Sequence, residues 1–237
     1  MRSFIVMAMF VVSLTHAAMN DYTETRYLEL DANDIEVLSI DAGAGSMDIQ
    51  GVAEASKITV KAMIEVPDAD VDEAMKIIEK KMQLSLAQDG SVARLNAWFK
   101  HGFMGFGSSS ARIDIEVHVP QGMAVIIDDG SGSIDVADLE ADISIDDGSG
   151  SINVSNVAHV RIDDGSGSID VSRASGDVFI NDGSGSINVR GVQGSVSIDD
   201  GSGSIKVRDV EEDLVIIDDG SGSLSYSDIR GTVEQDT

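Results

Sequence analysis

Pairs of acidic residues recur through the C-terminal half of the sequence, each followed by Gly-Ser-Gly-Ser. Carboxylates, serine hydroxyls and backbone carbonyls at such turns are the hard oxygen ligands that Ca²⁺ prefers. The two members of each pair define two columns of equivalent residues. The first acidic column is Asp128, Asp146, Asp163, Asn181, Asp199 and Asp218, and the second acidic column is Asp129, Asp147, Asp164, Asp182, Asp200 and Asp219.

The first acidic column is open to two interpretations. Carboxylates stacked about 4.8 Å apart repel by about 0.9 kcal/mol even in bulk water. Either counterions relieve this repulsion, or the side chains splay into solvent while the second column braces the turns. On the first interpretation calcium is a cofactor of the protein. Its predicted ligands are Asp128, Asp146, Asp163, Asp199 and Asp218.

Aromatic residues concentrate in one glycine-rich segment, residues 98–107, outside the repeats. The segment contains Trp98, Phe99, Phe103 and Phe106. An exposed apolar loop beside an acidic surface is typical of a contact site for a partner protein or a membrane surface. The alternative is that the segment folds back as a cap over one end of the core.

Catalysis finds little support in the sequence. His101, His118 and His159 are scattered along the chain, and no cysteine is present to act as a nucleophile. Paired carboxylates can hydrolyse glycosides, but here the acids repeat on every unit, whereas a catalytic site usually occurs once. We therefore expect a protein without enzymatic activity.

The repeat itself must position these residues. Apolar residues alternate on both sides of each turn, as Val160 and Ile162 before it and Ile169 and Val171 after it, which is typical of strands with one buried face. A fifth apolar position lies three residues beyond the second strand. The first glycines of the turns lie 17 to 19 residues apart, at Gly130, Gly148, Gly165, Gly183, Gly201 and Gly220.

A two-strand unit is marginally stable by itself, so neighbouring units must stack with equivalent strands paired. The sequence therefore predicts an all-β fold, a β-solenoid of two-strand rungs. A degenerate seventh copy of the turn lies at residues 41–47. Serines after the second glycine form another column, which we expect to bond within the turns, although a regular hydroxyl lattice could also bind glycans. This serine column is Ser133, Ser151, Ser168, Ser186, Ser204 and Ser223.

We divide the chain into residues 1–18, a β-rich N-terminal part at 19–120, and the regular repeats at 121–237. In the N-terminal part, Asp70 and Glu73 form a capping box for a short helix at about residues 70–82. Residues 82–88 and 91–99 flank Asp89-Gly90 as a hairpin. We expect this part to begin the stack, with its helix and hairpin projecting from the stack or capping it.

Residues 1–18 have the pattern of a secretory signal peptide: Arg2, an apolar run, then Thr-His-Ala-Ala. Removing them would change the formal charge from −26 to −27, because Arg2 is their only charged residue. No second long apolar run follows, so we expect no transmembrane segment after cleavage. A surface this acidic disfavours nucleic acid and anionic lipid as partners.

One passage carries a resemblance to a known family. Residues 113–122 read Ile-Asp-Ile-Glu-Val-His-Val-Pro-Gln-Gly and run into Val125, Ile127 and the Gly132-Ser133-Ile134 turn. This passage resembles the bacterial putative-adhesin β-strand-repeat family, a domain of unknown function in cell-envelope β-solenoid proteins. The resemblance covers residues 28–233. It implies an envelope location and a β-solenoid fold, and no established activity.

These observations favour an exported structural or adhesion-type binding protein, located in the periplasm or at the cell surface. Its repeated surface would engage a repetitive partner such as a cell-surface polysaccharide. The alternative is a periplasmic accessory or regulatory scaffold that binds another envelope protein through the aromatic segment, and that calcium would stabilise on the first interpretation of the acidic column. Open strand edges also allow self-association through the ends of the solenoid.

Overall fold

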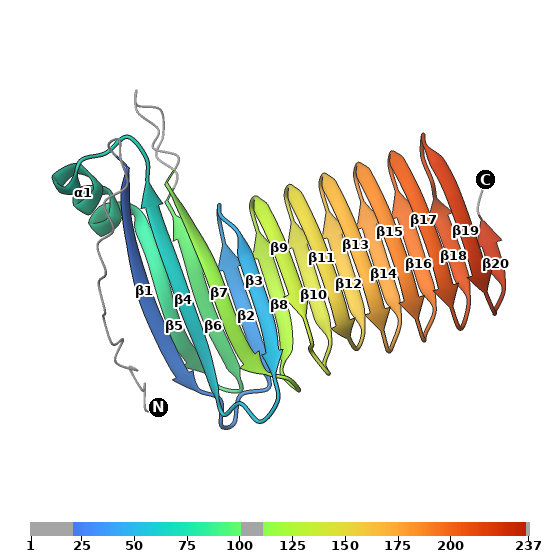
Figure 1. The fold of residues 1–237 in the computed structure, drawn as a ribbon, viewed down its shortest axis with the longest axis horizontal. Coiled ribbons are helices and arrows are strands. Elements are labelled where there is room, and N and C mark those ends of the chain that lie inside the picture. The colour runs from blue at the N-terminus through green and yellow to red at the C-terminus, as the bar shows by residue number, and fades with distance from the viewer. Residues whose placement is uncertain (1–20, 101–110, 236–237) are drawn as a thin grey trace.

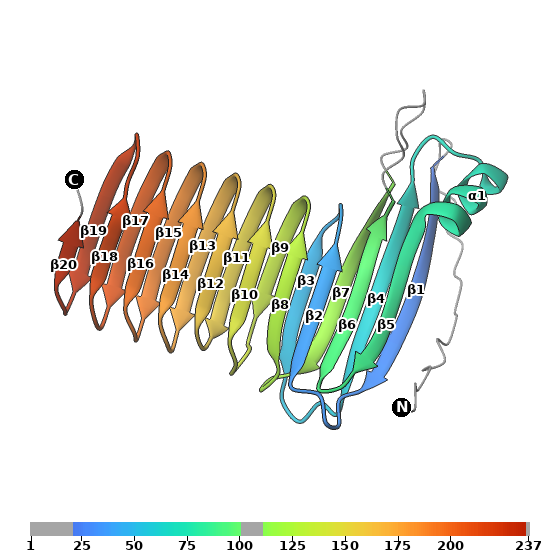
Figure 2. The same ribbon diagram turned by 180° about the vertical axis from the view of Figure 1, so that it is seen from behind.

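The computed structural model describes residues 21–100 and 111–235, so the predicted signal peptide lies outside the described residues. These described residues form a β-solenoid of two ten-stranded sheets, with one helix at the N-terminal end (Figures 1 and 2). This confirms the predicted fold class. No helix in the described ranges has the length and hydropathy needed to cross a bilayer.

Each regular rung gives one strand to each of the two sheets, which we name sheet A and sheet B. In sheet B the strands are β8 (Ala124–Asp129), β10 (Ile143–Asp147), β12 (Val160–Asp164), β14 (Val178–Asp182), β16 (Val196–Asp200), β18 (Leu214–Asp218) and β20 (Val233–Gln235). In sheet A they are β9 (Gly132–Ala137), β11 (Gly150–Val157), β13 (Gly167–Ala174), β15 (Gly185–Val192), β17 (Gly203–Val210) and β19 (Ser223–Ile229).

Equivalent strands of successive rungs pair in parallel and in register. Val160 faces Val178 and Ile162 faces Ile180, so each apolar position forms a continuous buried column. The rung of β12 and β13 sends five side chains into the core, each at most 3% exposed: Val160, Ile162, Ile169, Val171 and Ala174. The five predicted apolar columns are therefore confirmed in this rung.

The three-residue step to the fifth column has a backbone cause. In β11 the alternation is interrupted at Asn156, which has a φ of 54° and is skipped in the pairing with β13. This left-handed residue turns Val157 inward instead of outward. Non-glycine residues adopt this conformation rarely, and Asn and Asp do so most readily. Asp138, Arg173 and Asp209 occupy the equivalent bend in other rungs.

The two glycines of each turn serve different needs. Gly150 has a φ of +152°, and a Cβ there would lie 1.6 Å from the carbonyl oxygen of Gly132. Gly148 lacks positive φ, but a Cβ there would lie 2.6 Å from the Gly130 oxygen. Gly148 is therefore needed because successive rungs approach each other closely, and not for its backbone conformation.

The N-terminal part extends the stack, but the order of its strands in the sheets differs from their order along the chain. The degenerate copy forms β2 (Val37–Ala42) and β3 (Met47–Val52), which stack directly on β8 and β9. On the other side of this rung, sheet A continues outward with β7 (Arg112–Pro120), β4 (Lys57–Val66) and β1 (Tyr22–Asp31). Sheet B continues outward with β6 (Val92–Phe99) and β5 (Met82–Asp89).

The outermost N-terminal strands pair antiparallel and carry the helix. β1 pairs with β4, and β5 with β6 as the predicted hairpin. Helix α1 (Val71–Lys81) begins after Asp70, whose side chain accepts a bond from the Glu73 N–H, as the capping box predicts. Among the apolar residues of the helix, Ala74 and Ile78 are buried, whereas Val71 and Met75 are about half exposed.

The C-terminal end lacks such a cover within the described residues. Here β19 and β20 are the last strands of their sheets, and Tyr226 and Val233 continue inward columns while remaining 48% and 37% exposed. Ile217 is an extra residue that shifts the register between β16 and β18. Self-association through the solenoid edges would use this end, and it stays a prediction.

Candidate functional site

The first acidic column is an outward row along sheet B. Pairing brings Asp128, Asp146 and Asp163 side by side on successive rungs, and the row continues to Asn181, Asp199 and Asp218. It also extends to Asp41 of the degenerate copy, which the sequence reasoning missed. Most of these side chains are exposed, since they point away from the core at the end of each strand. The predicted column therefore exists as a solvated ladder.

The calcium prediction concerns this ladder. Among residues 21–100 and 111–235, no group of three or more His, Cys, Asp or Glu side chains is placed to hold a metal ion. A ladder offers pairs of carboxylates from neighbouring rungs, whereas Ca²⁺ takes six to eight oxygen ligands. Calcium binding at Asp128, Asp146, Asp163, Asp199 and Asp218 stays a prediction.

The second acidic column points into the core. Asp129 has the same strand parity as Val125 and Ile127, and this parity repeats in β10, β12, β14 and β16. It does not extend to Asp219, because the extra residue Ile217 shifts the register of β18. The exposed fractions are 5%, 2%, 3%, 2% and 0% for Asp129, Asp147, Asp164, Asp182 and Asp200. We name these five residues the inward Asp ladder. The alternation of apolar residues, continued by one step into the acidic pair, could have predicted it.

In four of the five ladder residues, one carboxyl oxygen braces the turn. The Ser149 N–H donates to Asp147 Oδ1 at 3.2 Å, and the Ser202 N–H donates to Asp200 Oδ1 at 3.0 Å. Ser166 and Ser184 repeat the arrangement with Asp164 and Asp182. The bracing role expected for the second acidic column is thus present, but it uses only half of each carboxyl group.

The other oxygen has no such partner. Oδ2 of all five ladder residues is buried without a hydrogen bond among the described residues. Burial, followed by repulsion from Asp147, raises the pKa of Asp129 to about 7. Burial also raises the pKa of Asp147 and of Asp182 to about 6, with repulsion from neighbouring Asp residues adding to it. Burial raises the pKa of Asp164 and of Asp200 as well, so all five residues of the inward Asp ladder take up protons at a higher pH than an exposed Asp does.

At four places in the outward columns, asparagine relieves this repulsion. In each case an Asn side chain donates to the Asp one rung before it, which replaces a repulsive pair with a hydrogen bond. These bonds join Asn153 Nδ2 to Asp135 Oδ1 (2.9 Å), Asn156 Nδ2 to Asp138 Oδ1 (2.6 Å), Asn181 Nδ2 to Asp163 Oδ1 (3.2 Å) and Asn188 Nδ2 to Asp170 Oδ1 (2.6 Å).

The serine column lies at the turn edge of sheet A, in register across six rungs. From Ser151 to Ser223 its side chains are exposed. Ser204 and Ser223 bond to each other at 3.3 Å, across rungs instead of within a turn. The expectation of bonds within the turns is therefore wrong for this pair, because the hydroxyls point to solvent.

The predicted aromatic contact residues are placed only in part. Trp98 and Phe99 are the last two residues of β6, not of a loop. Trp98 is partly exposed, and its Nε1 donates to Asp41 Oδ2 at 3.1 Å. Phe99 packs partly buried against the core. Phe103 and Phe106 lie outside the described residues, so the choice between contact and cap stays a prediction.

The two described histidines lie apart, in different elements. His118 is on the outer face of β7, with Nε2 3.9 Å from Glu116. His159 lies just before β12, and its Nδ1 accepts a bond from the Asp177 N–H at 2.9 Å. A nitrogen that accepts this bond is occupied in holding two neighbouring rungs together.

The fold and the repeated rungs define a class, the β-solenoid domains with one short rung per repeat. Within that class, the family model described as Toastrack DUF4097 matches residues 35–227. The match covers most of the chain, so the chain belongs to the Toastrack DUF4097 family. This confirms the resemblance seen at residues 113–134, and the family remains a domain of unknown function.

Three solved structures are similar to this chain, each over 90% of its length. A putative cell adhesion protein from Clostridium sporogenes is 12% identical, with a TM-score of 0.40 over 98% of that chain. Putative adhesins from Parabacteroides merdae and Bacteroides fragilis are 11% and 14% identical. Their TM-scores are 0.34 and 0.29, over 96% and 97% of those chains. A search of curated proteins finds no match.

Proposed function

We propose that this chain is an exported adhesion-type binding protein of the cell envelope, without catalytic activity, that binds a surface polysaccharide through the outer face of sheet A. The observation that carries the proposal is the serine column, which presents exposed hydroxyls on successive rungs. The spacing between these hydroxyls is about 4.8 Å, set by strand pairing. A partner with its own repeat can bind several of them at once.

A second polar column on the same face supports the proposal. Two residues after each serine, Asp135, Asn153, Asp170 and Asn188 point outward in register. Hydroxyls, carboxylates and carboxamides together offer both donors and acceptors to sugar hydroxyls. Individually weak contacts of this kind gain strength when several bind one polymer. The signal-peptide pattern at residues 1–18 supports export to the compartment where such polymers occur.

Binding to isolated envelopes and to purified envelope polysaccharide tests this proposal. We expect the protein without residues 1–18 to bind both, and substituting Ser168 and Ser186 by Ala to weaken binding several-fold. The matched control substitutes Ser144 and Ser197, on the outer face of sheet B, by Ala. Equal loss in both double variants, or no polysaccharide binding by the wild type, would overturn the proposal.

An accessory scaffold that binds another envelope protein is the second candidate. It is favoured by Tyr27 and Met63, which are both 45% exposed on the outer face of sheet A near its N-terminal end. Pairing of β1 with β4 places Tyr27 opposite Lys61, two residues from Met63, so the two side chains are diagonal neighbours. Affinity capture from envelope extracts would support this candidate if one stoichiometric protein is recovered and is lost on substituting Tyr27 and Met63 by Ser.

A further inference from the structure

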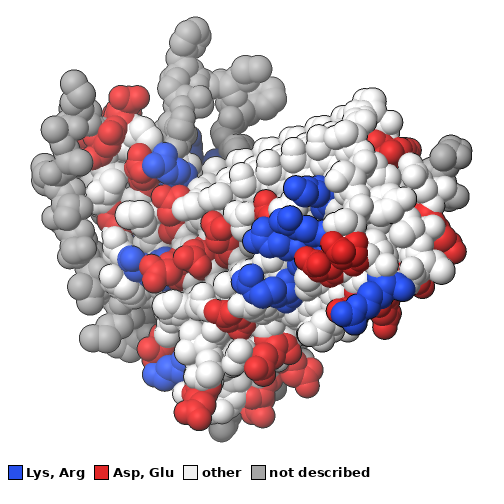
Figure 3. Space-filling view, turned by 45° about the vertical axis from the view of Figure 1, so that its right-hand side comes forward, with Lys and Arg blue, Asp and Glu red and all other residues white. Residues whose placement is uncertain are grey.

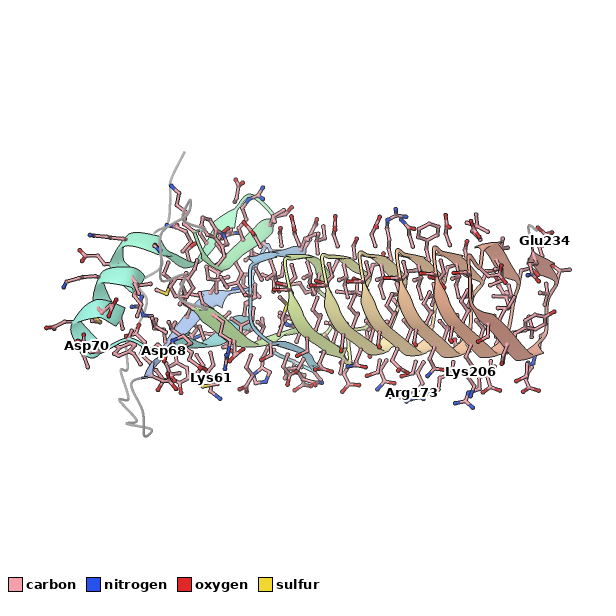
Figure 4. All side chains as sticks on the ribbon, turned by 90° about the horizontal axis from the view of Figure 1, so that it is seen from above. Lys61, Asp68, Asp70, Arg173, Lys206 and Glu234 are labelled. Carbon is pink, nitrogen blue, oxygen red and sulfur yellow. The ribbon has the colours of Figure 1, made fainter. Side chains whose placement is uncertain are left out.

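Four cationic side chains gather on the outer face of sheet A, in a chain whose formal charge is −26. They are Arg173, Arg190, Lys206 and Arg208, from the adjacent strands β13, β15 and β17. Figure 3 shows blue side chains gathered over the solenoid part with red ones beside them. Figure 4 labels Arg173 and Lys206 on one side of the ribbon, pointing outward. We name these four residues the basic cluster.

The strand register fixes the arrangement of the cluster. Arg190 of β15 lies directly opposite Arg208 of β17, so their backbones are about 4.8 Å apart. Lys206 precedes Arg208 by two residues and shares its outward face. Arg173 lies at the left-handed bend of β13, where its Nε donates to Asn156 Oδ1 at 2.5 Å. Three adjacent rungs thus bring four cations together over about 10 Å.

Three of these cations have no carboxylate partner in the part of the chain that the structure describes. Within residues 21–100 and 111–235, Arg190, Lys206 and Arg208 form no ion pair at 4.0 Å or less, although acids outnumber bases. The contrast with other cations of the chain is clear. Lys61 pairs with Glu116 at 2.8 Å, Arg94 pairs with Asp89 at 3.2 Å, and Arg230 pairs with Glu211.

The solenoid does not need these cations. Like charges directly opposite each other on neighbouring strands destabilise a sheet. The column that contains Arg190 and Arg208 has serine in other rungs, at Ser155, Ser172 and Ser227. Serine therefore satisfies the fold at this position. The arginine pair is a local cost to stability that a bound anion would offset.

The surroundings limit the kind of anion. Asp170 is near the cluster but already accepts a bond from Asn188, and Asp209 follows Arg208 at the next bend. Acidic residues therefore border the cluster, and the charge of the whole chain repels an extended polyanion. A compact oxyanion avoids this repulsion. The planar fork of an arginine guanidinium matches the oxygens of phosphate or carboxylate, and the lysine adds a point charge.

We propose that the basic cluster binds a single phosphate or carboxylate group carried by an otherwise uncharged polysaccharide. This inference rests on the proposed function, because the cluster continues the outward polar columns of sheet A toward the C-terminal end. Arg190 and Arg208 hold the oxyanion between their forks, and Lys206 neutralises the remaining charge. The neighbouring hydroxyls and carboxamides bind the neutral sugars of the same polymer.

Titration of the protein without residues 1–18 with small probes tests the cluster directly, by NMR of arginine Nε–Hε groups and backbone amides. Glucose 1-phosphate and glucuronate are the anionic probes, and glucose is the neutral one. We expect shifts confined to β13, β15 and β17 with at least one anionic probe and none with glucose. The probe that gives the shifts tells phosphate from carboxylate. Binding should weaken with added salt, because exposed charges are screened.

Variants separate the cluster from general charge effects. Substituting Arg190 and Arg208 by Ser should weaken binding of the anionic probe by about tenfold or more. The control removes two arginines elsewhere: Arg161, which lies over the Phe179 ring, and Arg230. It should bind as the wild type does. Substituting Arg190 and Arg208 by Lys keeps the charge but loses the forks, so we expect an intermediate affinity. Equal affinity in the wild type and the Ser variant would overturn the proposal.

Envelope binding distinguishes failure of the cluster from failure of the proposed function. If the Arg190→Ser, Arg208→Ser variant binds envelope polysaccharide as well as the wild type, the cluster proposal fails and the proposed function stands. If the wild type binds no polysaccharide, the proposed function fails. The small-probe titration then still decides whether the cluster binds an oxyanion. Stronger binding to phosphatidylglycerol vesicles than to the sugar probes would identify a lipid surface instead and overturn the polysaccharide assignment.

Discussion

In the rungs from β8 to β16, the two residues before each turn glycine occupy opposite environments. Asp146 belongs to the outward first column and is exposed, whereas Asp147 belongs to the inward Asp ladder and is 2% exposed. Both repeat with the same spacing between rungs, because they lie on the same strands. The difference between the columns therefore isolates the effect of burial on a stack of carboxyl groups.

In the outward columns, asparagine relieves the repulsion between stacked carboxylates, although water already screens these exposed charges. Asn181 interrupts the first acidic column, and Asn153 and Asn188 interrupt the column on sheet A. The inward Asp ladder contains no asparagine at its five positions, although burial makes charge costlier there. Asn can brace an Asx turn as Asp does, so turn geometry alone does not require Asp. Only the carboxyl group can take up a proton, and that distinguishes the inward ladder.

Substituting all five residues of the inward Asp ladder by Asn should have the largest effect. Each amide keeps the acceptor for the serine N–H and adds a donor for the next rung, as in stacked Asn ladders. At about pH 8 we expect unfolding to cost about 2–5 kcal/mol more than in the wild type, since a pKa unit corresponds to about 1.4 kcal/mol. Chemical denaturation measures this difference.

The matched control for this prediction substitutes Asp128, Asp146, Asp163, Asp199 and Asp218 by Asn. These side chains are mostly solvated, so we expect less than about 1 kcal/mol of change. Equal stabilisation by both sets would show that net charge, not burial, governs the stability of the stack. A destabilised inward variant would show that the buried carboxyls are stabilising as they are.

The pH dependence of the wild type should be the next largest effect. The pKa of Asp129 is raised to about 7 and those of Asp147 and Asp182 to about 6, above the ordinary 3.8. The folded state thus binds more protons than the unfolded state between about pH 4 and pH 7, so stability falls as pH rises through this window. We expect the melting temperature to be several degrees higher at about pH 5 than at about pH 8.

The same pH comparison in the five-Asn inward variant should give a nearly flat profile, while the outward control keeps the slope of the wild type. Asp138 and Asp213 have lowered pKa values, but they lose their contribution only below about pH 4, outside this window. A wild-type profile that rises with pH would contradict the proposed protonation of the ladder.

The regular rungs were predicted well from the sequence because several independent features of the repeat indicate the same structure. Turn glycines, strand alternation and stacking all require the same register, as the pairing of Val160 with Val178 shows. The N-terminal strand order was not predictable in this way. β2 and β3 stack on β8 and β9 although about 70 residues of chain separate them, and no local pattern specifies that long-range choice.

The candidate sites were predicted unevenly for a similar reason. The acidic columns follow from the repeat, but the titration of Asp147 depends on burial, which requires strand parity to be continued into the turn. The basic cluster depends on Arg190 and Arg208 being opposite each other, and these residues break the repeat instead of following it. A prediction based on the residues that recur in every rung therefore misses this cluster.

A smaller effect is expected from breaking one outward Asn–Asp bond. Asn153 lies between Asp135 and Asp170 in register, and Asn153→Asp would place three carboxylates in a row. We expect a loss of about 0.5–1 kcal/mol, measured by thermal or denaturant unfolding. The control is Asn188→Asp, where Lys206 lies on the other side and offsets the repulsion. A loss at Asn188→Asp as large as at Asn153→Asp would show that cross-rung charge pairing is not what stabilises this face.

Added Ca²⁺ should have the smallest effect on stability, and it tests which of the two acidic columns binds a cation. If Ca²⁺ occupies the first acidic column, millimolar Ca²⁺ should raise the melting temperature slightly, because exposed low-density sites bind weakly. The five-Asn outward variant should lose this response, and the five-Asn inward variant should keep it. Calorimetry without heat, together with an unchanged melting temperature, would reject the site. If only the inward variant loses the response, Ca²⁺ competes with protons for the buried carboxyl groups. The cation site would then be the inward Asp ladder and not the first acidic column.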